Sequence, residues 1–138
     1  MMEKHAAFSD SQFEQQFESG RLDPTLFSHE AHLRLAWIHI RRYGVEQAIR
    51  NLTVQIRGFA EGLGAHDKYN ETVTIAAIRA VYHFMLKGTW SEFADFMAAN
   101  SRLKTHFREL LSQHYSTDIF TSEKARRTYL EPELLPFD

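Results

Sequence analysis

The chain has 138 residues, of which 43% are hydrophobic and 25% are charged, and its formal net charge is −2. This length and composition are typical of one folded globular domain, so we expect residues 1–138 to form a single domain around its own core. The near-balanced charge excludes the dense basic surface that nucleic-acid phosphates require. Cysteine is absent, which excludes disulfides, thiolate metal sites and a cysteine nucleophile.

No part of the chain has the pattern of a targeting or membrane segment. The opening residues, MMEKHAAFSD, contain no long apolar run, and no window approaches the roughly 20 apolar residues that span a bilayer. We therefore expect a cytoplasmic protein with neither a membrane nor a nucleic acid as its partner. Eight histidines stand out beside only six glycines and three prolines. Imidazole chemistry is the first functional chemistry to consider.

Helix signals recur along the chain, and the alternation of apolar and polar residues that marks a strand is missing. A first amphipathic helix is predicted over residues 8–18, with Ser9 or Asp10 as its N-cap and Gly20 after its end. A second is predicted over residues 28–43, between Ser28 as N-cap and Gly44 as its stop. Apolar residues at three-to-four spacing predict a third helix over residues 45–62.

The predicted fourth helix, over residues 70–86, carries only Arg79 as an internal charge, so we expect it to be buried on most sides. Asn70 is its expected N-cap. Shorter helices are predicted over residues 91–99, with Ser91 as N-cap, over residues 102–114, and from Ser122 onward. The expected fold is all-α, a single-domain antiparallel bundle of six to seven helices with the second and fourth helices at its centre.

His29 and His32 define the candidate site. They lie three residues apart in the first turn of the predicted second helix, so both project from one face. The second and third helices have similar lengths, which returns the chain to the end of the bundle where the second helix began. Five further chemistry-bearing residues are then expected at that end: His66, Asp67, Tyr69, Asn70 and Glu71.

A metal ion is one interpretation of this cluster. The expected ligands are His29, His32, His66 and Glu71, a nitrogen and oxygen set that suits Zn, Fe, Mn or Ni. The H-x-x-H spacing is common by chance in a histidine-rich chain and differs from the H-E-x-x-H spacing of metalloproteases. Hydrogen bonding and packing at a helix start would account for the same histidines without a metal.

Metal-free chemistry could use the same residues, with Glu71 and Tyr69 as catalytic groups beside the histidine pair. His39, Asn70 and Arg79 are the expected substrate-binding side chains. Arg79 has an alternative, because a guanidinium in an apolar helix also serves as half of an internal ion pair. The sequence shows no activated nucleophile. Whether the protein is an enzyme is left open.

Three functions fit these residues. The first is a metal-dependent enzyme or metal-binding protein that acts on a small polar metabolite. The second is a metal-free small-molecule-binding or accessory protein with a pocket between the second and fourth helices. The third is a helical protein-interaction module, which would act through its surface as a homodimer.

Two stretches, FSHEAHLRLAW and KYNETVT, resemble a group of small uncharacterised bacterial all-helical proteins. Those proteins carry an F-x-H-x-x-H-L-R-x-A-W stretch followed by a K-Y-H-E-T-x-T stretch. The matching residues are Phe27, His29, His32, Leu33, Arg34, Ala36 and Trp37 in the first stretch and Lys68, Tyr69, Glu71, Thr72 and Thr74 in the second. Asn70 departs from the pattern, because the similar sequences have histidine there. The resemblance implies a site formed by the same two segments, with one potential ligand replaced by an amide.

Overall fold

A computed structural model describes residues 3–137, apart from the side chain of His66. Within that range the chain is helical and contains no strand, which confirms the all-α prediction. The α-helices are α1 (Asp10–Glu18), α2 (His29–Tyr43), α3 (Val45–Gly62), α4 (Glu71–Met85), α5 (Phe93–Ala99), α6 (Arg102–Thr105), α7 (Phe107–Ser112) and α8 (Glu123–Arg127). Three short 3₁₀ helices complete the described part: η1 (Lys4–Ala7), η2 (Pro24–Leu26) and η3 (His66–Lys68).

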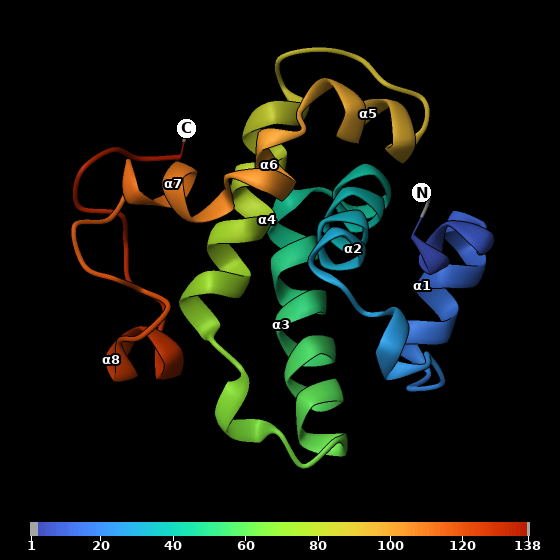
Figure 1. The fold of residues 1–138 in the computed structure, drawn as a ribbon, viewed down its shortest axis with the longest axis horizontal. Coiled ribbons are helices and arrows are strands. Elements are labelled where there is room, and N and C mark those ends of the chain that lie inside the picture. The colour runs from blue at the N-terminus through green and yellow to red at the C-terminus, as the bar shows by residue number, and fades with distance from the viewer. Residues whose placement is uncertain (1–2, 138) are drawn as a thin grey trace.

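Helices α2, α3 and α4 pack against one another and form the centre of the bundle. In Figure 1, α1 lies on one side of this group, α7 and α8 lie on the other, and α5 covers one end. Most of α2 and α4 is buried, whereas α3 buries only Ala48, Leu52 and Ile56. The expectation that the second and fourth helices lie at the centre of the bundle is therefore confirmed, and α3 packs there beside them. None of the described helices is long and apolar enough to cross a membrane.

The ends of α2 follow from the residues that flank it. The Ser28 hydroxyl accepts a hydrogen bond from the Ala31 amide at 3.1 Å, which satisfies one of the free amides of the first turn. Gly44 follows the last turn with a φ of 85°, a conformation that glycine adopts without steric cost. The chain then enters α3 directly at Val45.

Asn70 caps α4, as predicted. Its side-chain oxygen accepts from the Val73 amide at 2.9 Å, and its side-chain nitrogen donates to the Ile119 carbonyl at 2.8 Å. Both ends of the amide are therefore used, one for the helix start and one to hold the C-terminal part of the chain. Ser122 also caps α8, through a 3.1 Å bond from Ala125.

Two boundaries in the second half differ from the predictions. Ser91 is not the N-cap of α5, because that helix begins at Phe93 after Glu92, and Glu92 makes no side-chain capping bond. The helix predicted over residues 102–114 is two helices, α6 and α7, separated at His106. His106 has a φ of −132°, well outside helical values, so the axis breaks there. This division gives eight α-helices within residues 3–137 instead of six to seven.

Candidate functional site

The predicted histidine pair lies at the start of α2, but its two rings have different surroundings. His29 is exposed, and its Nε2 donates to the Leu103 carbonyl at 3.0 Å. His32 is half-buried, and its Nε2 is shielded from solvent without a hydrogen-bond partner. Burial and, secondarily, the neighbouring His29 lower the pKa of His32 to about 4, so this imidazole is neutral at pH 7.

Glu71 and Tyr69 bond to each other and to α3. The Tyr69 hydroxyl donates to the Glu71 carboxylate at 2.5 Å, and the Arg57 guanidinium donates to the same oxygen at 3.1 Å. Burial and the bond to Glu71 raise the pKa of the Tyr69 hydroxyl, so it stays protonated. The carboxylate of Glu71 is therefore held by Tyr69, a residue of the predicted site, and by Arg57, which lies outside that site.

The predicted metal ligands do not converge among the described side chains. His29, His32 and Glu71 do not form a group whose ligand atoms lie within 4.8 Å of one another. The side chain of His66, the fourth predicted ligand, lies outside the part of the chain that the structure describes. The start of α2 does lie beside the end of α3, where the rings of Phe27 and Phe59 are 5.2 Å apart. The arrangement of the helices therefore agrees with the prediction. The side chains of His29, His32 and Glu71 point in different directions, and this keeps their ligand atoms apart.

The three predicted substrate-binding residues have structural partners. Asn70 is the N-cap described above. His39 is 1% exposed, its Nδ1 lies 3.3 Å from the Asn51 amide nitrogen, and its Nε2 lies 4.0 Å from Glu14. Arg79 lies 3.8 Å from Glu46, which matches the ion-pair alternative for this residue. These side chains do not line one common pocket among those found in residues 3–137.

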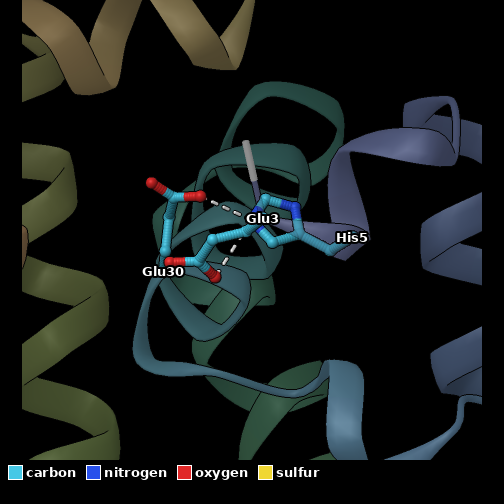
Figure 2. A group of neighbouring side chains, drawn as sticks. All are labelled: Glu3, His5 and Glu30. Atoms are coloured by element: carbon cyan, nitrogen blue, oxygen red, sulfur yellow. Dashed lines mark hydrogen bonds and ion pairs between the residues drawn. The ribbon is translucent and has the colours of Figure 1, made fainter. Parts of the chain in front are cut away.

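A different cluster converges at the N-terminus of the chain. The ligand atoms of Glu3, His5 and Glu30 all lie within 4.8 Å of one another, and this is the one such group of three or more found in the described residues. Figure 2 shows the two carboxylates on the same side of the His5 ring, each joined by a dashed line to its Nε2. Its Nε2 lies 2.7 Å from Glu30 and 3.7 Å from Glu3. The group joins the segment before α1 to the first turn of α2.

Arg34 holds this segment against α2. Its guanidinium donates to the backbone carbonyls of His5 at 2.7 Å and Phe8 at 2.8 Å, and to the Asp10 carboxylate at 2.9 Å. Arg34 itself is only 7% exposed, so these bonds satisfy a charge that would otherwise be costly to bury. The arginine that interrupts the apolar sequence of α2 is therefore the residue that positions His5.

Arg34 also fixes the tautomer of His5. The guanidinium nitrogen lies 3.2 Å from the His5 Nδ1, and a guanidinium can only donate, so Nδ1 accepts. The ring proton of the neutral imidazole is then on Nε2, which donates to Glu30. A metal on Nε2 would need the proton on Nδ1, where it would face the Arg34 donor. His5 is consequently better suited to orient Glu30 than to ligate a metal.

Lys104, on α6, supplies a cation to both carboxylates. Its ammonium lies 2.9 Å from Glu3 and 3.2 Å from Glu30, and the Ser28 hydroxyl also donates to Glu3. Burial would raise the pKa of Glu3, but the bonds from Lys104 and Ser28 outweigh it and the pKa is lowered. The same two carboxylates raise the pKa of Lys104. Glu3 and Lys104 are therefore both charged at neutral pH.

This cluster lines the largest described cleft, which we call the N-terminal cleft and which has a volume of about 660 Å³. Four carboxylates face it, from Glu3, Asp10, Glu30 and Glu92, against two cations, Arg34 and Lys104. Its apolar wall comes from α5 and consists of Phe93, Ala94, Met97 and Ala98. A cleft of this size with an apolar wall and a few convergent polar groups is typical of a small-molecule site. Its excess of carboxylates favours a positively charged ligand.

The sequence-based reasoning missed Glu3 and His5. Glu30 stands in the first turn of α2, where the helix dipole alone accounts for a carboxylate, and the first residues carry no helix signal in the sequence. The sequence does contain one signal for this contact. Arg34 lies in the apolar sequence of α2, and a buried guanidinium requires a partner from elsewhere in the chain. That partner is the segment from His5 to Asp10.

Comparison with known proteins found no family model, no curated protein and no solved structure that matches this chain. The bacterial group that the sequence resembles is therefore still an expectation.

Proposed function

We propose that the protein binds a small organic molecule with a positively charged group, and that the ligand occupies the N-terminal cleft. The charged group would lie between Glu3 and Glu30, where Lys104 now provides the counter-charge. The apolar body would lie along Phe93 and Met97 of α5. The observation that carries the proposal is the presence of two convergent carboxylates and an apolar wall in one cleft of about 660 Å³.

Lys104 is central to this proposal because it imitates the ligand's cation. Its side chain is 41% exposed and comes from the four-residue helix α6, so it can leave the carboxylates without disturbing the core. A ligand ammonium would replace it and donate to the same two carboxylates. His5, whose Nε2 proton is directed at Glu30, keeps that carboxylate in place during the exchange.

Isothermal titration calorimetry with phenethylamine tests the proposal, with the neutral 2-phenylethanol as the matched ligand control. We expect saturable binding of the amine at pH 7 and binding of the alcohol weaker by at least about tenfold, as expected for loss of a charge-assisted bond. Glu30→Gln should weaken amine binding to a similar extent. Glu61→Gln is the control for charge alone, because Glu61 is exposed and does not line the cleft.

Lys104→Met should change the amine affinity in the opposite direction from Glu30→Gln. Removing the internal cation leaves Glu3 and Glu30 in need of a counter-charge, so amine affinity should rise. A general loss of structure would lower affinity instead. Unchanged or reduced affinity in Lys104→Met, together with unchanged affinity in Glu30→Gln, contradicts the proposal.

A divalent metal is the second candidate, and the convergence of Glu3, His5 and Glu30 favours it. The carboxylates suit a hard cation, whereas the His5 tautomer set by Arg34 opposes nitrogen ligation. Titration with the chlorides of Mg, Ca, Mn and Zn in place of the amine distinguishes the two. A stoichiometric metal that also blocks phenethylamine would assign the site to a metal ion, and binding of the amine alone would assign it to an organic cation.

A further inference from the structure

A second cleft, of about 460 Å³, lies on the neighbouring face of the α2 start, and in its lining imidazole and cationic side chains outnumber carboxylates. Its basic side chains are His29, His32, Lys104, His106 and Arg108, against one carboxylate, Glu109. Its apolar wall consists of Val73 and Ala77 from α4, Phe107 from α7, and Phe120 from the segment between α7 and α8. We call this the histidine cleft.

His32 is the first sign that the histidine cleft holds a ligand. Its Nε2 is buried and has no hydrogen-bond partner, although buried polar atoms in folded proteins are nearly always paired. The ring also packs against Phe27, with 5.7 Å between the centroids, so its orientation is set by the core. A neutral imidazole can carry its proton on Nε2 and donate it to an acceptor in the cleft.

Arg108 is the second sign. Its guanidinium lies 4.0 Å from the centre of the Phe120 ring, and no carboxylate pairs with it in the described part of the chain. Lys104, by contrast, is occupied by Glu3 and Glu30. A guanidinium stacked on an aromatic ring keeps its edge donors available for a planar anion.

We propose that the histidine cleft binds a small anion with an aromatic body, with Arg108 and the Nε2–H group of His32 as donors. Carboxylates and phosphates share the chemistry that these donors recognise. The aromatic body would contact Phe107 and Phe120, which line the cleft. The histidine cleft and the N-terminal cleft would therefore bind different ligands, and different residues would decide the affinity of each.

Benzoate and phenyl phosphate are suitable probes, with benzamide as the neutral control. We expect chemical-shift changes in NMR spectra of the full chain to centre on the rings of His32 and Phe120. The pKa of His32 should rise on binding, because an anion stabilises the protonated ring. Benzamide should bind at least about tenfold more weakly than benzoate.

Two variants locate the site. Arg108→Gln removes an exposed guanidinium, and it should weaken benzoate binding at least about tenfold. Arg102→Gln removes the same charge from the exposed surface of α6, away from the cleft, and should leave the affinity within about twofold. His32→Asn, which shortens the donor, should also weaken binding.

The outcomes are distinct. Saturable benzoate or phenyl phosphate binding that Arg108→Gln weakens and Arg102→Gln does not supports the proposal, and the preferred probe identifies the anion class. Absence of saturable binding by both probes, or equal losses in the two arginine variants, overturns it. Phenethylamine binding at the N-terminal cleft should be unchanged in Arg108→Gln, so the two proposed sites can fail independently.

Discussion

Arg34→Lys tests how the N-terminal segment is held, since it keeps the positive charge and removes the planar set of donors. The guanidinium reaches two carbonyls, the Asp10 carboxylate and the His5 Nδ1 at distances of 2.7–3.2 Å. One ammonium cannot occupy all of these positions. Because Asp10 is 35% exposed, its share of the interaction is screened by solvent. We estimate a loss of about 2–3 kcal/mol in the free energy of unfolding, mainly from the buried carbonyls.

Urea denaturation and calorimetry measure this effect, with an expected fall in Tm of about 10 °C for a domain of this size. Hydrogen exchange should rise in η1, because Lys4–Ala7 loses its anchor while α2–α4 stay packed. Arg50→Lys is the matched control, since Arg50 is exposed and bonds only to Gln47 among the described residues. A change below about 0.5 kcal/mol in Arg34→Lys would refute the anchoring role.

Three further predictions concern stability. His32→Gln should reduce the loss of stability between pH 6.5 and 4, because the unfolded chain takes up a proton there that the folded ring, with its pKa lowered to about 4, does not. Urea titrations should show that His32 lowers the free energy of unfolding by up to about 3 kcal/mol as the pH falls from 6.5 to 4, and an identical pH slope in the variant contradicts this. Asn70→Ala should lower the free energy of unfolding by about 1–3 kcal/mol. Asn70→Asp keeps the cap and should lower it clearly less. Equal losses for the two variants in thermal unfolding would show that the cap is unimportant. Tyr69→Phe should lower the free energy of unfolding by about 1 kcal/mol and leave amine binding, measured by calorimetry, unchanged. A loss of amine binding would show that Tyr69 belongs to the binding site.

Local signals predicted the elements that depend on neighbouring residues. The α3 range, the Ser28 and Asn70 caps and the Gly44 stop all follow from short-range capping and backbone preferences. The break at His106 had no comparable signal, because the surrounding sequence keeps a helical spacing and no proline or glycine interrupts it. The division of α6 from α7 is therefore a result of tertiary packing.

The candidate site was harder to predict because it joins residues that are distant in the sequence. Helix lengths placed the start of α2 near α4 correctly, yet Glu71 bonds to Arg57 instead of pointing toward His32. Side-chain direction at a helix start depends on the partners available, and helix periodicity does not specify those partners. Glu3 and His5 reach Glu30 only because Arg34 fixes the segment before α1.

The direct test of the N-terminal cleft is the position of a bound amine. Nuclear Overhauser effects between the phenethylamine ring and the methyl groups of Ala94, Met97 and Ala98 should be present in the wild-type protein and weaker in Glu30→Gln at the same ligand concentration. The Lys104 side-chain signals should shift as its ammonium leaves Glu3 and Glu30. Contacts to other parts of the surface, or bound amine with no effect on Lys104, would contradict the account.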